Sequence, residues 1–268
     1  MAIMSVDLAF RRWTDLGLVV LKGAGRNAPV QCEILNWDDG GNGTGPVQAD
    51  ILAGRLNHFC NVRGVSVLML DGPQAWKSRT NGHAHARTSE RLLNTAAKTG
   101  LPGMVKPITY RGFAEFCVDV YDALCRRGWR RLDTAAGPDA GQERVLVESY
   151  PCAAWKSLGL KPLPSKRRAR VSDLAEAFAA LNALVPLKVN RPPNHDQLQA
   201  IVGGLPGLAL EARNYDGARI VGTAPRREDG QWREGFIVLP VRPSGDQVIT
   251  WSSARIQVAR ADSTVSTS

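Results

Sequence analysis

Short apolar runs separated by turn-forming residues mark the first part of the chain. Residues 2–9, 16–21 and 30–35 are rich in aliphatic and β-branched side chains, and residues 10–15 form a turn between the first two runs. The glycine-rich segment KGAGRNAP joins the second and third runs, as in a hairpin. The pattern predicts an antiparallel meander of three strands.

Farther along the chain, segments with the hydrophobic period of a helix alternate with apolar runs typical of strands. Residues 50–62 place Ile51, Leu52, Leu56 and Phe59 on one helix face. The unbroken apolar run 65–70 is typical of an interior strand covered on both faces, and 145–148 and 234–240 indicate further strands. Further helices are predicted from near residue 86 and for 109–131, 151–158, 171–184 and 194–202, with loops at 37–46, 161–170 and 222–230.

This order of elements predicts an α/β protein with a mixed β-sheet, an antiparallel meander plus parallel strands, flanked by helices. We expect a single domain over residues 1–258 with a helical insertion around 100–140, and a disordered tail at 259–268.

Composition adds two constraints to this picture. The 268-residue chain carries a formal net charge of +9, which favours a polyanionic partner such as nucleic acid. It contains no run of 18 apolar residues and no signal-peptide pattern, so we expect no membrane span and a cytoplasmic location. The five cysteines form no CxxC pair, and with the four histidines they show no zinc-like spacing.

Acidic residues stand where the predicted strands end. Asp7, Asp71 and Glu148 each close an apolar run, and Asp196 lies in the first turn of a late helix. Carboxylates gathered at one edge of a sheet repel one another unless a cation neutralises them. The pattern predicts a site for Mg²⁺ or Mn²⁺, and such sites commonly serve attack on phosphate.

Each acid also has a structural alternative. Asp7 could begin a turn, Asp71 precedes a Gly-Pro turn, and Glu148 could stabilise the N-terminus of the next helix. The metal-site interpretation gains from all three standing at strand ends, since independent turn residues need not do so.

Basic residues supply candidate phosphate contacts. Arg87 suits a bidentate grip and Lys166 a point charge. The alternative for both is plain surface solubility, and for Lys166, within the basic run KRRAR, the two interpretations are about equal. Glu90, one turn after Arg87, could form a helix-surface ion pair with it. His83 and His85 are possible but less favoured metal ligands. The predicted substrate-binding residues are Arg87, Glu90, Lys166 and Arg167.

A family resemblance rests on ordered motifs: VDLA, LDGP, RTSER, VESYPCAAWKSLG, PSKRR, NHDQLQA and EGFIVLP. With these motifs the chain is similar to the ribonuclease H-like predicted nucleases grouped as domain of unknown function 429. The resemblance implies a ribonuclease H-like fold, with Asp7 bridging two ions and Asp71 and Glu148 flanking it. The resemblance also implies a metal-binding aspartate in a late helix. In this chain Gln199 stands at that place, and Asp196, one helical turn earlier, is the acid that could replace it.

The leading hypothesis is therefore a metal-dependent phosphodiester hydrolase, a predicted nuclease that acts on nucleic acid. A catalytically weak or inactive nucleic-acid-binding or scaffold protein of the same fold is the alternative, because Gln199 cannot supply a negative ligand. An actin-like phosphotransferase is less favoured, since Leu8, Ala9 and Phe10 follow Asp7 where such enzymes need glycines.

Overall fold

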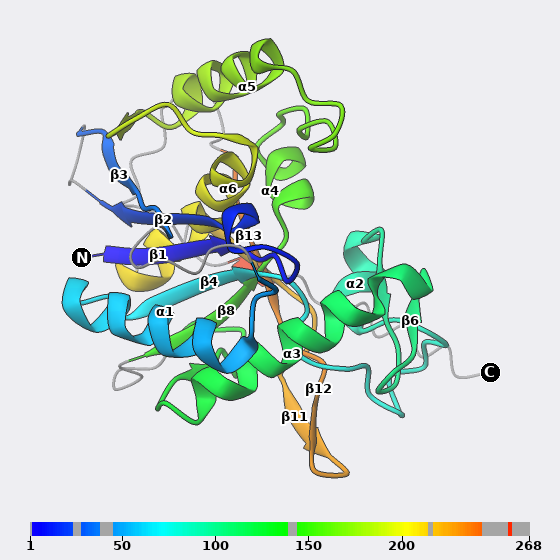
Figure 1. Ribbon diagram of the computed structural model, residues 1–268. Coiled ribbons are helices and arrows are strands. Elements are labelled where there is room, and N and C mark those ends of the chain that lie inside the picture. Colours follow the sequence, from blue (N-terminus) through cyan, green and yellow to red (C-terminus); the bar gives the residue numbers. More distant parts are fainter. Residues whose placement is uncertain are drawn as a thin grey trace.

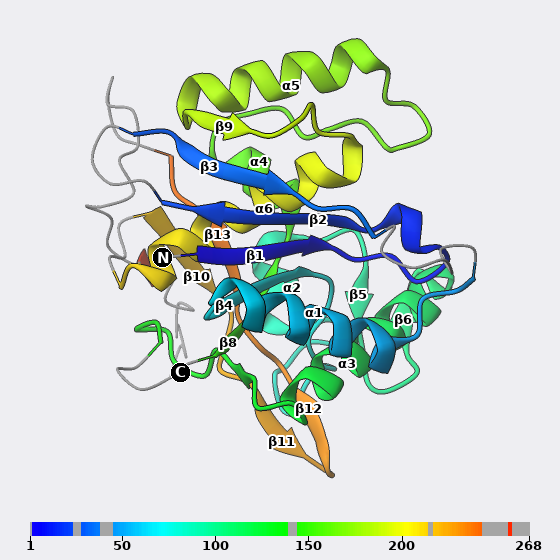
Figure 2. The ribbon, with the colours of Figure 1, turned by 60° about the vertical axis from the view of Figure 1, so that its left-hand side comes forward.

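One large mixed sheet with helices on both faces forms the body of the protein (Figures 1 and 2). The structure is a computed structural model, and it describes residues 2–23, 28–37, 45–138, 144–213 and 217–242, together with the backbone of 257–258. The predicted α/β class is confirmed.

The strand order of the sheet is β14-β10-β13-β8-β4-β1-β2-β3-β9, with β7 beside β8. The meander β1-β2-β3 is antiparallel, whereas β1, β4, β8 and β13 run parallel to one another. The predicted meander and parallel interior strands are both confirmed. The strands are β1 (Ala2–Asp7), β2 (Gly17–Lys22), β3 (Val30–Ile34), β4 (Val67–Asp71), β7 (Arg130–Arg131), β8 (Val145–Ser149), β9 (Leu187–Val189), β10 (Ala218–Val221), β13 (Ile237–Pro240) and β14 (Gln257–Val258).

Helices cover the sheet from two sides. In Figure 1, α1 and α3 lie on one face, and α4 and α6 lie on the other with α5 beyond them. Two small hairpins, β5-β6 and β11-β12, stand apart from the sheet. The remaining elements are η1 (Trp13–Asp15), α1 (Ala49–Arg63), α2 (Thr88–Leu93), β5 (Lys98–Thr99), β6 (Val105–Lys106), η2 (Ile108–Tyr110), α3 (Arg111–Cys125), α4 (Pro151–Ser157), α5 (Val171–Leu184), α6 (His195–Glu211), β11 (Arg226–Glu228) and β12 (Gln231–Arg233).

The alternation of side chains along each strand divides the core into two layers. Ile3 of β1 packs with Ile201 of α6. The next residue, Met4, belongs to the other layer, together with Leu52 of α1 and Leu124 of α3. Successive strand residues point to opposite faces of the sheet, so neighbouring residues of one strand pack against different helices.

Glycines allow α6 to approach the sheet closely. A Cβ added at Gly204 would lie 2.6 Å from the Cβ of Ser5, and one at Gly207 would lie 2.9 Å from the Cγ of Met69. Real Cβ atoms do not come so near, and the helix therefore packs with its backbone against β1 and β4. This contact carries the N-terminus of α6 to the ends of the central strands.

Several predicted boundaries differ from the structure. The helix predicted for 109–131 ends at Cys125, since Gly128 in the following turn has a φ of +89°. The predicted loop 222–230 contains β11, and the short strands β9 and β10 were not predicted. Residues 38–44 and the predicted tail 259–268 lie outside the described residues. The single domain with an insertion at 100–140 stays a prediction.

None of the helices in the described segments is long and apolar enough to cross a membrane.

A pair of glycine substitutions tests the close packing of α6. We expect Gly204→Ala to lower the free energy of unfolding by about 1–3 kcal/mol, because the new methyl group meets Ser5 on a packed sheet. Gly54→Ala in α1 is the matched control: its Cβ would meet only the far end of the Arg127 side chain at 3.7 Å, so helix propensity should leave stability equal or higher. Urea unfolding measures both, and equal effects would contradict the packing argument.

Candidate functional site

Asp7 and Asp71 stand side by side at the ends of two parallel strands. They are register partners and the last residues of β1 and β4, so both side chains leave the same face of the sheet. Burial raises the pKa of Asp7 well above its usual range, and the negative charges of Asp71 and Asp196 raise it further. Burial likewise raises the pKa of Asp71 to about 7; a hydrogen bond from Asp7 lowers this pKa, and the negative charge of Glu148 raises it. The two carboxyls therefore retain a proton where no cation neutralises them.

The N-terminus of α6 brings a third acid, Asp196, to this pair. Asn194 caps the helix: its side chain accepts from the backbone nitrogen of Gln197 at 2.9 Å, and Gln197 reciprocates at 2.9 Å. Gly17, the register partner of Asp7, makes room for the first turn, because a Cβ there would lie 2.1 Å from the Asp196 carbonyl oxygen. Asp196 is 5% exposed.

Lys166 reaches the same acids from the basic loop between α4 and α5. Its ammonium group donates to Asp196 and, at 2.8 Å, to Asp15. His195 fixes the loop from the other side, with Nδ1 3.2 Å from Asp196 and Nε2 2.9 Å from the carbonyl oxygen of Pro164. A positive charge on a half-exposed side chain thus pairs with Asp196 and lowers the pKa of Asp7.

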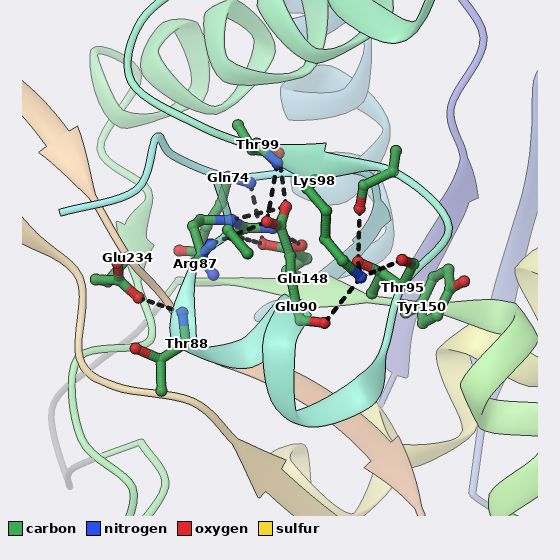
Figure 3. A network of polar contacts seen from close by, with 12 residues as sticks. Gln74, Arg87, Thr88, Glu90, Thr95, Lys98, Thr99, Glu148, Tyr150 and Glu234 are labelled. Atoms are coloured by element: carbon green, nitrogen blue, oxygen red, sulfur yellow. Dashed lines mark hydrogen bonds and ion pairs between the residues drawn. The ribbon is translucent and has the colours of Figure 1, made fainter. Parts of the chain in front are cut away.

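Glu148 leaves the opposite face of the sheet from this group. Its register partner in β4 is Leu70, whereas Asp71 pairs with Ser149. Glu148 is 3% exposed and accepts from Arg87 Nη1 at 2.7 Å, Arg87 Nη2 at 2.6 Å and the backbone nitrogen of Gln74 at 3.0 Å (Figure 3). Burial raises its pKa, an effect that the charge of Arg87 opposes. The structure therefore pairs Glu148 with an arginine beneath the strand ends.

Arg87 and Glu90 lie inside the protein. The Arg87 side chain is 1% exposed, and its Nη2 is also 3.0 Å from Glu90 Oε1. Glu90 accepts in addition from the backbone nitrogen of Thr99 at 2.9 Å and the Thr99 hydroxyl at 2.6 Å (Figure 3). The predicted Arg87–Glu90 ion pair is present, but it is buried and does not lie on a helix surface. The Arg87 guanidinium binds the carboxylates of Glu90 and Glu148.

The other predicted residues have varied positions. Arg167 is exposed in the basic loop. Gln199 is half-buried and accepts from the indole nitrogen of Trp155 at 2.9 Å, so its amide is engaged in packing α4 on α6. The backbone nitrogen of His83 donates to the Asn81 side chain at 3.0 Å, in the loop before α2. The roles given to all these residues stay predictions.

Two polar neighbours of the acids were not predicted from the sequence. Ser149 shares the face of Asp7 and Asp71, and Asp15 shares Lys166 with Asp196. Ser149 directly follows Glu148 in β8. If the register of β8 with β4 had been known, the alternation of side chains along β8 would have shown that Ser149, not Glu148, lies on the face of Asp71.

The donor set suits a hard divalent cation. Within the described part of the chain, no group of three or more Asp, Glu, His or Cys side chains is arranged to hold a metal ion. The oxygen atoms of Asp7 and Asp71, with Asp196 beside them, are nevertheless the ligand type that Mg²⁺ and Mn²⁺ prefer. A cation there would replace the proton that the adjoining carboxyls now retain.

Comparisons with known proteins concern the fold alone. No protein-family model and no curated protein matches the chain, so the assignment to domain of unknown function 429 stays a prediction. Among solved structures, the chain is similar to Thermus thermophilus RuvC, with 15% identity, coverage of 80% of this chain and 96% of that one, and a TM-score of 0.38. A structure of T. thermophilus RuvC in complex with a Holliday junction substrate matches with 12% identity, the same coverages and a TM-score of 0.35. The strand order itself, an antiparallel meander followed by parallel strands, agrees with the mixed sheet predicted from the sequence.

The raised pKa of Asp71 predicts a pH-dependent stability. Between about pH 4 and pH 7 the unfolded chain loses the Asp71 proton while the folded protein keeps it, so stability falls as pH rises through this window. Asp71→Asn should flatten the fall and make the protein more stable at pH 8 by an amount on the order of 1–3 kcal/mol. Thermal unfolding from pH 4 to 8 measures this.

Asp229→Asn is the control for that experiment. Asp229 is exposed at the tip of the β11-β12 hairpin, with 61% of its side chain accessible. Its substitution should leave the pH profile of stability unchanged. Parallel profiles for wild type and Asp71→Asn would contradict the prediction.

Proposed function

We propose that this chain is a metal-dependent phosphodiester hydrolase that acts on nucleic acid. The observation that carries the proposal is the register of Asp7 with Asp71 at the ends of parallel strands, with Asp196 close enough to raise the pKa of Asp7. Uncompensated carboxyl groups with strongly raised pKa values are more frequent at functional sites than elsewhere.

Asp7, Asp71 and Asp196 would hold the cation in this proposal. A bound Mg²⁺ or Mn²⁺ supplies activation of water and stabilisation of charge on the phosphate oxygens. Lys166 neutralises Asp196 and Asp15 and keeps a positive charge next to the position of a phosphate. The Glu148–Arg87 ion pair fixes the end of β8 against the loop that follows β4, and so keeps Asp71 in place.

The basic loop supports nucleic acid as the substrate. Lys161, Lys166, Arg167, Arg168 and Arg170 are exposed within ten residues of one another, and the loop is fixed to the acids through Lys166. Cationic side chains next to a cation site suit the backbone of a polyanion, and binding of this kind depends strongly on salt.

One observation favours a second candidate, a nucleic-acid-binding protein without catalysis. Gln199 contributes no negative charge and its side chain accepts from Trp155. Mn²⁺ affinity separates the two functions: wild-type protein without millimolar or tighter binding that depends on Asp7 would favour the second.

Asp7→Asn tests the catalytic proposal directly. We expect Mn²⁺-dependent cleavage of labelled single-stranded, duplex or hybrid oligonucleotides by the wild type, and a loss of about 100-fold or more in the variant, because a central ligand charge is removed. Asp229→Asn should retain wild-type cleavage. Absence of turnover by the wild type on every substrate would contradict the proposal.

Substitutions in the basic loop test the binding surface. Replacing both Arg167 and Arg168 by Ala should weaken nucleic-acid binding, and the slope of log affinity against log salt should fall by about one for each phosphate that the loop no longer neutralises. Arg111→Ala, at an exposed ion pair with Glu115 in α3, is the control and should leave the slope unchanged. Fluorescence anisotropy at several salt concentrations measures the slopes, and an unaltered slope in the double variant would exclude the loop as a phosphate-binding segment.

A further inference from the structure

The end of β8 presents two polar side chains, Glu148 and Ser149, which lie on opposite faces of the sheet. The parallel register pairs Asp7 with Asp71 and Asp71 with Ser149. Register partners in neighbouring strands lie about 5 Å apart and point the same way. Ser149 is therefore the β8 residue that extends the row of Asp7 and Asp71.

The hydroxyl of Ser149 is buried without a partner. The residue is 2% exposed, and its Oγ makes no hydrogen bond in the structure. A Cβ added at Gly203 of α6 would lie 3.0 Å from this Oγ, so the helix closes over the hydroxyl. Leaving a buried hydroxyl unpaired is unfavourable, and such a group is expected to have a use for its lone pairs.

Both carboxylate oxygens of Glu148, in contrast, already accept hydrogen bonds. Both of its oxygens accept from the guanidinium of Arg87, and one accepts also from the backbone nitrogen of Gln74. Recruiting this carboxylate to a cation would break a buried ion pair and leave Arg87 without that partner, which is strongly unfavourable.

We propose that Ser149, and not Glu148, supplies the β8 oxygen ligand of the cation site formed by Asp7 and Asp71; this inference rests on the proposed function. A serine hydroxyl has two lone pairs and ligates Mg²⁺ in phosphate-binding loops, so its chemistry fits a hard cation. The site would then combine aspartate charges with one neutral oxygen, which is consistent with the single positive charge that Lys166 already places beside it.

Ser5 provides a matched control. It is also fully buried with an unpartnered hydroxyl beneath a glycine of α6, Gly204, but it stands two residues before Asp7 in β1. That offset is roughly 6–7 Å along the strand, away from the strand ends. Ser5→Ala thus removes a hydroxyl of the same kind at a position that the proposed ligand set does not reach.

Mn²⁺ binding to the full chain, followed by the electron paramagnetic resonance signal of the free ion, tests the inference. Ser149→Ala should weaken Mn²⁺ binding by roughly tenfold, whereas Ser5→Ala should bind as the wild type does. Ser149→Cys should lose affinity for Mn²⁺ and gain affinity for Cd²⁺, because a thiol ligand prefers the softer ion. Its sulfur-to-cadmium absorption should exceed that of the wild type, whose own free cysteines set the baseline.

Glu148→Gln completes the set. It should lower the melting temperature, because Arg87 loses its charged partner, and it should reduce Mn²⁺ affinity less than Ser149→Ala does, because Glu148 acts on the site only by positioning Asp71. Wild-type Mn²⁺ affinity in Ser149→Ala, or equal losses in Ser149→Ala and Ser5→Ala, would overturn the inference while leaving the proposed function intact. A wild-type protein that binds no Mn²⁺ would overturn the proposed function as well.

Discussion

The mutual repulsion of Asp7 and Asp71 is the constraint on which the rest of the site depends. Parallel pairing of β1 with β4 fixes the two carboxyl groups next to each other, and burial removes the water that would screen them. Two features reduce the repulsion: the raised pKa values of Asp7 and Asp71 favour a retained proton, and Lys166 lies beside Asp196. Neither measure removes it, and the site therefore retains a preference for added positive charge.

The close packing of α6 is what allows a third acid to join this pair. The helix rests on β1 and β4 through Gly204 and Gly207, and Gly17 leaves space for its first turn. Larger residues at these places would lift the helix and carry Asp196 away from Asp7. The geometry of the site is thus set partly by residues that have no side chain to contribute.

Much of the fold and part of the site could be predicted from the sequence. Apolar runs with clear ends identified the central strands, and the residues at those ends, Asp7 and Asp71, proved to be partners. Glu148 could not be placed in the same way, because a shift of one residue in register moves a side chain to the other face, and no local pattern reveals how β4 pairs with β8. The burial of Arg87 was missed for a related reason, since its partner Glu148 lies 61 residues away.

The two faces of the strand ends treat negative charge differently, and this contrast supports the site assignment. On one face, Glu148 and Glu90 share Arg87 and several N–H donors, so their charge is satisfied within the protein. On the other face, Asp7 and Asp71 have each other, and Lys166, whose charge lowers the pKa of Asp7, is bound to Asp196 and Asp15. A protein with a net charge of +9 has basic residues to spare, yet none pairs directly with Asp7 or Asp71 among the described residues. The negative charges of Glu148 and Glu90 are paired within the protein, whereas those of Asp7 and Asp71 are not paired in the described part of the chain. We therefore expect a positively charged ligand to bind on the face of Asp7 and Asp71.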